Sequence, residues 1–338
     1  MNTAPAAPAV LILGARGRFG QAGARAFAAA GWQVFAQMRP GAVALPITGV
    51  RWIEAQPDDT ALLFAAARGV SVVVNALSPQ YTHRVWRREV PRLTRAAIAI
   101  TRELRATLML PGNVYNFGEA LPAQLYEDTP QLANTVKGGL RIDSERQIRS
   151  ATDDGVMKAV VIRAGDFFGS GQGSWLDLVL AKDLRRGRFG YPGALDRPHA
   201  WAYLPDLAQS FVRVAQARER LTAFESLHFE GHSPTGQDWR DALTEVAREH
   251  GWIGPGDPLQ ARSFPWPLLR ALGLVVPTFE ALSEMRYLWR RPHQLVDVRM
   301  LALVGPSPHT PFREAVRVAI ADLELAPAGM GAAVGGIA

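Results

Sequence analysis

The first thirty residues contain a strand, a glycine-rich turn and a helix in that order. Ala9 to Leu13 is a short unbroken apolar run, the pattern of a parallel strand that is buried on both faces. Gly14, Gly17 and Gly20 follow with the spacing G-x-x-G-x-x-G, and the alanine-rich segment 21–30 predicts a helix. Free backbone N–H groups and the positive end of a helix dipole then meet at one point, which favours binding of an anion.

Each glycine of this turn has its own physical reason. Gly14 lets the chain leave the strand in a tight turn, Gly17 lets a pyrophosphate approach the backbone, and Gly20 lets the helix lie close to the strand. The order of elements predicts a dinucleotide site, and the alternative is an ordinary strand-to-helix turn. Because no Gly-Lys-Ser/Thr follows, a Walker A phosphate loop is excluded.

The second predicted strand, Trp32 to Met38, is followed directly by Arg39. In a dinucleotide fold, a carboxylate at this place binds the free 2′-hydroxyl of the adenosine ribose. Here a guanidinium stands instead, and Arg16 and Arg18 add two more inside the glycine turn. Guanidinium groups bind phosphate in a bidentate fork, so we expect a 2′-phosphate and hence NADP, with NAD as the alternative.

The composition limits the classes of function. The chain has 338 residues, a net charge of +6 and no cysteine, which excludes disulfides and cysteine-ligated metals. The arginines are scattered without interleaved aromatic residues, which favours a solvated basic surface over nucleic-acid binding. No run reaches the ~18 apolar residues of a membrane span, no signal peptide is evident, and the histidines are too irregularly spaced for a metal site. We therefore expect a cytoplasmic protein without nucleic-acid, membrane or metal partners.

Strands and helices alternate up to about residue 230. Further strands are predicted at Val50–Glu54, Ser71–Asn75, Ala106–Leu110, Lys158–Arg163 and Ser226–Phe229. The alternation predicts an α/β fold, a Rossmann-type doubly wound parallel sheet, over residues 9–170 and 199–230. A smaller, mostly helical substrate lobe is expected from residues 171–198 and 231–325. Residues 1–8 and 326–338 are predicted tails.

Ligands of such sheets bind at the carboxyl ends of the strands. The residues at these ends and in the glycine turn are therefore the predicted cofactor contacts. They are Gly14, Arg16, Gly17, Arg18, Phe19, Gly20, Arg39, Asn75, Ala76, Leu77 and Gly112.

Four segments resemble the atypical and extended short-chain dehydrogenase/reductase superfamily, in its NAD-dependent epimerase/dehydratase branch. They are the glycine turn, Asn113-Val114-Tyr115, Arg163 to Gly169 and Tyr203 to Ala208, over residues 9 to about 230. The resemblance implies an NAD(P)-binding Rossmann domain and redox or epimerase chemistry on a small substrate. It also implies a nicotinamide contact at Asp166, and it leaves a homodimer open.

The catalytic pair that this resemblance implies is missing. In active members a tyrosine, the acid/base, precedes by four positions a lysine that holds the nicotinamide ribose. None of the six tyrosines has a lysine four positions further on. Alignment on Val114-Tyr115 puts Pro111 in the usual serine position, and counting back from Glu145 puts Lys137 in the tyrosine position and Arg141 in the lysine position.

Two interpretations of Lys137 remain. It is a replacement acid/base whose pKa falls toward neutrality beside Arg141 and the nicotinamide, with Asn113 or Tyr115 holding the substrate oxygen. Alternatively, Lys137 and Arg141 are surface or phosphate contacts, paired with acidic residues of the same helix. Both remain predicted cofactor contacts in either case.

Two functions follow from these patterns. One is an NADP(H)-dependent oxidoreductase or epimerase-like enzyme that acts on a small carbonyl or hydroxyl substrate through a nonstandard acid/base. The other is an NADP(H)-binding redox sensor or scaffold without turnover. The missing tyrosine–lysine pair favours the sensor, whereas the large second lobe favours the enzyme. Ser-His-Asp hydrolysis has no support because G-x-S-x-G is absent.

Overall fold

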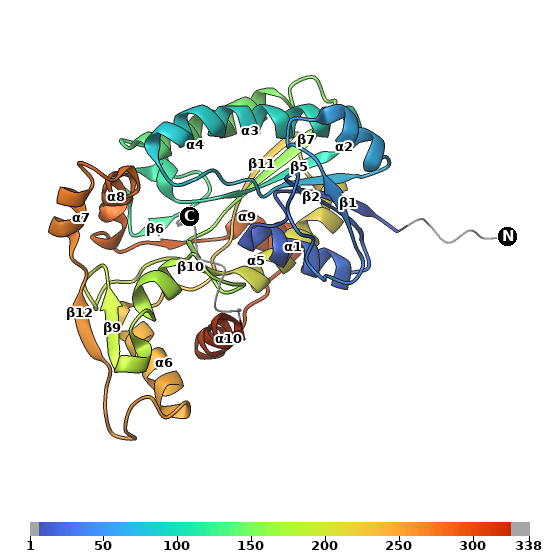
Figure 1. Ribbon diagram of the computed structural model, residues 1–338. Coiled ribbons are helices and arrows are strands. Elements are labelled where there is room, and N and C mark those ends of the chain that lie inside the picture. The colour runs from blue at the N-terminus through green and yellow to red at the C-terminus, as the bar shows by residue number, and fades with distance from the viewer. Residues whose placement is uncertain (1–6, 326–338) are drawn as a thin grey trace.

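A parallel sheet of seven strands lies at the centre of the computed structural model, which describes residues 7–325. The strand order is β11-β7-β5-β4-β1-β2-β3 (Figure 1). These strands are β1 (Ala9–Leu13), β2 (Gln33–Met38), β3 (Val50–Glu54), β4 (Val72–Asn75), β5 (Thr107–Gly112), β7 (Lys158–Arg163) and β11 (Phe224–His228). The sheet confirms the predicted α/β fold of Rossmann type. Apart from residues 7 and 8, the predicted tails lie outside the described residues.

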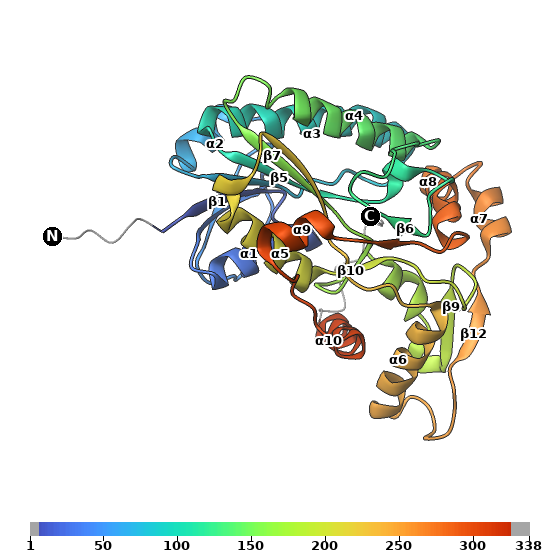
Figure 2. The same cartoon turned by 180° about the vertical axis from the view of Figure 1, so that it is seen from behind.

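Helices cover both faces of this sheet (Figures 1 and 2). One face carries α1 (Arg18–Ala29) and α5 (Leu204–Gln216), and the other carries α2 (Thr60–Ala66), α3 (His83–Leu104) and α4 (Val136–Ser150). The first strand shows why an unbroken apolar run was needed. Its Val10 and Ile12 pack with α1 and α5, whereas Leu11 and Leu13 pack on the opposite face.

Short paired strands and helices form the region expected as the second lobe. Its helices and strands are α6 (Gly236–Glu249), α7 (Trp266–Leu272), α8 (Pro277–Ser283), α10 (Phe312–Leu325), β9 (Arg188–Tyr191) and β12 (Gln260–Ser263). Two other pairs connect segments that are distant in sequence, namely β8 (Asp166–Phe168) with β10 (Trp201–Tyr203) and β6 (Gln124–Leu125) with β13 (Gln294–Leu295). The sequence patterns predicted none of these short strands, because each depends on a partner far away along the chain.

The sequence also predicts one regular helix over residues 174–186 and another over 278–290, and both predictions are wrong. The chain forms a π-helical turn, η2 (Leu176–Leu180), and a 3-10 turn, η3 (Leu184–Arg186), before Gly187 adopts a φ of +68°. The predicted helix 278–290 likewise divides into α8 and a 3-10 stretch, η5 (Glu284–Trp289). Tyr287, Leu288 and Trp289, the last three residues of η5, are all buried. Three consecutive residues cannot all lie on one face of an α-helix.

One helix of the expected second lobe packs on the sheet domain instead. This helix, α9 (Val298–Val304), contacts α5 and β11, and its Met300 is buried there. The sequence pattern gave no sign that this helix packs on the sheet domain, because residues 231–325 were all assigned to the second lobe.

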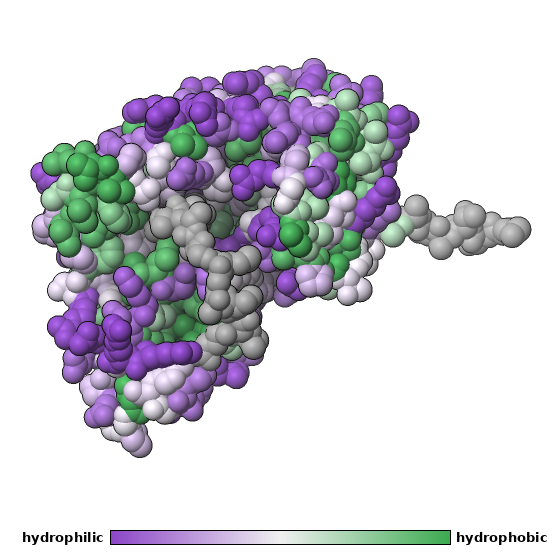
Figure 3. All heavy atoms as spheres, viewed as in Figure 1, coloured by the Kyte–Doolittle hydropathy of each residue, from purple (hydrophilic) through white to green (hydrophobic). Residues whose placement is uncertain are grey.

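The surface differs between the two parts of the molecule (Figure 3). Hydrophilic residues cover the outer side of α3 and α4, where Arg84, Arg87 and Arg95 are exposed. Apolar residues gather over α7 and α8, where Leu274 and Val275 are exposed. No helix in the described part of the chain is long and apolar enough to cross a bilayer.

Candidate cofactor site

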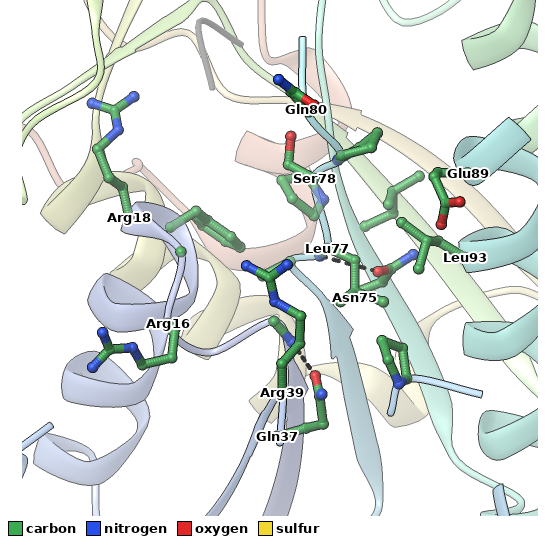
Figure 4. A pocket seen from close by; sticks show the side chains of 18 of the residues that line it. Arg16, Arg18, Gln37, Arg39, Asn75, Leu77, Ser78, Gln80, Glu89 and Leu93 are labelled. Atoms are coloured by element: carbon green, nitrogen blue, oxygen red, sulfur yellow. Dashed lines mark hydrogen bonds between the residues drawn. The ribbon is translucent and has the colours of Figure 1, made fainter. Parts of the chain in front are cut away.

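A cavity of about 750 Å³ lies at the carboxyl ends of β1, β2, β4 and β5 (Figure 4). The order of the strands reverses between β1 and β4, and open parallel sheets bind ligands at such a switch point. Residues of the glycine turn, the end of β2 and the segments after β4 and β5 line the cavity. The cavity therefore coincides with the predicted position of the dinucleotide.

The glycine turn leaves an open helix N-terminus beside this cavity. Gly14 has a φ of +73°, and its N–H donates to Gln37 Oε1 at 2.8 Å. A Cβ on Gly20 would come within 2.5 Å of the Gly14 carbonyl oxygen, so glycine is needed for α1 to approach the turn. Gly17 is the N-cap of α1, whose first turn has neither a side-chain cap nor an acidic residue within the described chain. Its free N–H groups can therefore bind a phosphate group.

Arginine dominates the charged lining of the cavity, which consists of six arginines and one glutamate, Glu89. Glu89 is shared by Arg88 and Arg92, at N···O distances of 2.7 and 2.8 Å. The remaining lining arginines have no ion-pair partner among residues 7–325. They are Arg16, Arg18, Arg39 and Arg141.

The three arginines predicted to select the cofactor point in different directions (Figure 4). Arg39 is exposed at the end of β2 and lines the cavity, as Leu77 does. Arg16 points away from Arg18 and donates to the Val43 carbonyl oxygen. Arg18 reaches the Phe167 carbonyl oxygen of β8 at 3.4 and 3.5 Å, and burial lowers its pKa to about 10 despite the nearby carboxylates. Arg16 and Arg39 thus lie apart from Arg18.

The segments after β4 and β5 form the opposite wall. Asn75 Oδ1 accepts a hydrogen bond from Leu77 N at 3.2 Å, which fixes the turn after β4. Gly112 ends β5 so close to Arg163 that a Cβ would lie 2.8 Å from the Arg163 Cγ. Asn113 also lines the cavity, and its Oδ1 accepts from Tyr115 N at 3.0 Å. Small or turn-forming residues thus keep this wall clear of bulky side chains.

Lys137, in the expected tyrosine position, is buried and does not line the cavity. Its Nζ donates to the Ala281 carbonyl oxygen at 2.7 Å and lies 3.3 Å from Glu284 Oε2. Burial lowers the pKa of Lys137 to about 8, although Glu284 opposes this shift. The lysine therefore has a partner on η5 rather than on its own helix, and the surface position of the second interpretation does not hold.

Glu284 connects this lysine to two other groups. Its Oε2 lies 3.0 Å from His83 Nε2, and its Oε1 accepts from Val136 N at 2.6 Å. Burial alone would raise the pKa of Glu284, but these hydrogen bonds and the charge of Lys137 lower it to about 2. Glu284 thereby links η5 to the start of α4 through its contacts with Val136 and Lys137.

Two buried tyrosines, Tyr81 and Tyr115, lie next to each other outside the cavity lining. The hydroxyl oxygens of Tyr81 and Tyr115 are 3.4 Å apart, and burial raises the pKa of both. Arg141, which lines the cavity in the lysine position, lies 5.1 Å from the Trp86 ring, and its charge opposes the rise at Tyr115. A tyrosine hydroxyl and a cation therefore lie near each other, although the tyrosine does not come from the usual position and the cation is an arginine.

Asp166 is buried on β8 and does not line the cavity. Its Oδ2 lies 2.8 Å from His199 Nε2, and the His199 ring stacks on Trp289 with centroids 4.2 Å apart. Among the residues described, no group of three or more His, Asp or Glu side chains could hold a metal ion. Asp166 and His199 thus form a buried pair close to the cavity.

Most of the predicted site residues come together at the cavity. Those that line it are Gly14, Arg16, Gly17, Arg18, Phe19, Arg39, Asn75, Ala76, Leu77, Gly112, Asn113 and Arg141. Gly20 instead packs α1 against the turn, and Lys137, Tyr115 and Asp166 are buried outside the lining.

Sequence reasoning missed Gln37, Glu284 and His199. A buried glutamine in an otherwise apolar strand was a usable signal for Gln37, which also donates to the Ala55 carbonyl oxygen at 2.6 Å. The other two residues carried no local signal.

Solved structures match this fold over nearly the whole chain. A UDP-galactose 4-epimerase has a TM-score of 0.70 at 14% identity, covering 93% of this chain and 98% of that one. The Bordetella bronchiseptica enzyme WbmH in complex with NAD+ has a TM-score of 0.68 at 15% identity, covering 94% and 98%. The Thermotoga maritima UDP-glucose 4-epimerase with UDP-glucose has a TM-score of 0.68 at 12% identity, covering 93% and 98%.

These likenesses confirm that the chain has the Rossmann-type fold of these structures, two of which are epimerases. No protein-family model matches the sequence. No curated protein matches it either.

Proposed function

We propose that the protein binds NADP(H) in the cavity and is an oxidoreductase or epimerase-like enzyme for a small carbonyl or hydroxyl substrate. The observation that carries the proposal is the open N-terminus of α1 next to Arg16 and Arg39, both without a carboxylate partner among the described residues. The N–H groups suit a pyrophosphate, and the guanidinium groups suit a 2′-phosphate. Several neighbours in fold are epimerases, and WbmH was solved with NAD+.

The chemistry would use residues on the β5 side of the cavity. When bound, a nicotinamide cofactor supplies hydride transfer to or from a carbon of the substrate. Asn113 and Arg141 line the wall there and are the polar groups available to orient a substrate oxygen and a ribose. The role of Lys137 as replacement acid/base stays a prediction. Its contacts oppose this role, because Ala281 and Glu284 hold the ammonium outside the cavity lining.

Cofactor binding is tested by titrating the protein with NADPH and NADH and following nucleotide fluorescence. We expect NADPH to bind at least tenfold more tightly than NADH. Equal affinity would contradict the 2′-phosphate assignment, and no binding of either would contradict the site itself.

Turnover is tested with a panel of aldehydes, ketones and sugar nucleotides. An epimerase returns its hydride and leaves NADPH absorbance unchanged, so each substrate is also followed by NMR. Conversion of any member supports an enzyme. Tight NADPH binding without conversion would contradict turnover on these classes.

One observation favours the second candidate, an NADP(H)-binding sensor or scaffold without turnover. Pro111 occupies the usual serine position on the cavity wall, and Lys137 occupies the usual tyrosine position but is engaged elsewhere. A proline offers no hydroxyl to orient a substrate oxygen. For this role, NADPH and NADP+ should bind with different affinities and change the conformation differently, measured by hydrogen exchange of the second lobe.

A further inference from the structure

Arg18 has more hydrogen-bonding capacity than the described residues satisfy. Its contacts with the Phe167 carbonyl oxygen, at 3.4 and 3.5 Å, are long. A guanidinium has five N–H donors, and a half-buried cation without a partner is costly. A ligand that enters the cavity would therefore gain by presenting an anion to Arg18.

The two carboxylates whose charges act on Arg18 are Asp166 and Asp177, and both already accept hydrogen bonds from other residues. Asp166 bonds to His199 at 2.8 Å. Asp177 accepts from Gly173 N at 2.8 Å and from Ser174 N at 2.7 Å. Neither forms an ion pair with Arg18 within the described part of the chain.

Arg18 is the first residue of α1, but its guanidinium extends from there to the Phe167 carbonyl oxygen of β8. The N–H groups at the start of α1 suit the pyrophosphate, and Arg16 and Arg39 suit the 2′-phosphate. Arg18 points away from Arg16, on the side of the cavity where Gln80 and Ser78 lie (Figure 4). Its contact with β8 brings it next to the chain that leads into the second lobe.

Arg141 is a second lining cation of the same kind. It has no ion-pair partner among residues 7–325, and its Nε is buried without a hydrogen bond there. Its neighbour Glu145 bonds instead to Arg163 and Asn116. Four unpaired lining arginines exceed what one 2′-phosphate requires.

We infer that Arg18 binds an anionic group of the substrate, a carboxylate or a phosphate. The inference rests on the proposed function and narrows it to carbonyl or hydroxyl compounds that carry such a group. Both anions accept paired hydrogen bonds from a guanidinium fork. Gln80 and Ser78 supply neutral hydrogen-bonding groups on the same side.

The test uses the full chain saturated with NADP+ at constant ionic strength. Oxamate serves as the carboxylate probe, inorganic phosphate as the phosphate probe and acetamide as the neutral control, each titrated by calorimetry. We expect oxamate or phosphate to bind and acetamide not to bind. The probe whose affinity depends on Arg18 identifies the anion.

Variants separate this inference from cofactor binding. Arg18→Gln is expected to weaken probe binding to the protein saturated with NADP+ at least tenfold, with Arg18→Lys recovering part of the loss. Arg16→Gln, the matched control, should weaken NADPH and leave probe binding to the saturated protein unchanged.

Two results would overturn the inference. They are equal probe binding to the saturated wild type and the saturated Arg18→Gln variant, and no probe binding at all. Failure of the wild type to bind NADPH would instead contradict the proposed function.

Discussion

The β2 side and the β5 side of the cavity depart to different degrees from what the resemblance implies. On the β2 side, the glycine turn and the uncapped start of α1 present N–H groups suited to a phosphate, as the resemblance implies, and the departure is that Arg39 stands where an NAD-binding fold has a carboxylate. On the β5 side, Pro111, Lys137 and Arg141 replace all three expected catalytic residues, and a buried network extends to η5. The difference teaches that an N–H array built from glycine and a helix start depends little on side chains, whereas the catalytic positions depend on them entirely.

The largest effect is expected from reversing the charge on the β2 side. Arg39→Asp should weaken NADPH binding by about 100-fold, because it replaces a phosphate-binding guanidinium with a repelling carboxylate. NADH has no 2′-phosphate, so its affinity should change less than about fivefold. Fluorescence titration with both nucleotides measures the ratio. Equal losses would show that Arg39 does not face a 2′-phosphate.

Backbone approach on the β2 side can be tested through stability. Gly20→Ala places a Cβ within 2.5 Å of the Gly14 carbonyl oxygen and 2.7 Å of the Ala15 Cα. We expect the free energy of unfolding to fall by about 2 to 3 kcal/mol, measured by urea denaturation. Gly139→Ala is the matched control, since its Cβ would meet nothing within 4 Å inside α4. That change should stabilise by up to about 1 kcal/mol, and an equal loss in both variants would contradict the crowding at Gly20.

The two sides also differed in how far the sequence could predict them. The glycine turn is a local pattern, so its position, its helix and the cavity beside it followed from residues 9–38. The partner of Lys137 is Glu284, 147 positions away, and no spacing rule along one helix could find it. The sequence instead favoured acidic neighbours on α4, but Glu145 pairs with Arg163 of β7.

The fold shows the same division. Most strands of the large sheet were predictable because they are runs of residues buried on both faces, whereas the edge strand β3 exposes Arg51 and Glu54. The pairs β8 with β10 and β6 with β13 were not, since a strand of two or three residues has no periodicity of its own. The 3-10 stretch η5 formed where tertiary packing of consecutive bulky residues overrode helix propensity.

The buried network on the β5 side predicts a stability that depends on pH. The pKa of Glu284 is about 2, below its ordinary 4.5, so its stabilisation is complete above pH 4.5 and is lost as the pH falls toward 2. Glu284→Gln should lower the free energy of unfolding at pH 7 by about 2 kcal/mol and flatten its decline between pH 4.5 and 2. Urea denaturation across this range measures both effects.

The control for this network is Glu280→Gln. Its carboxylate is 59% exposed and lies 3.5 Å from His83 Nδ1, so the change should cost less than about 0.5 kcal/mol. Identical pH profiles for the two variants would contradict the role of Glu284.

The smallest effect on cofactor affinity is expected at Lys137, whose contacts lie outside the cavity. Lys137→Met should leave NADPH affinity within about twofold, because Nζ is bonded to Ala281 and Glu284 rather than to the lining. Arg141→Met should weaken NADPH about tenfold, because Arg141 lines the cavity in the position that holds the ribose. Fluorescence titration compares the two variants. Equal losses would place Lys137 at the cofactor, and turnover that persists in Lys137→Met would exclude this residue as the acid/base.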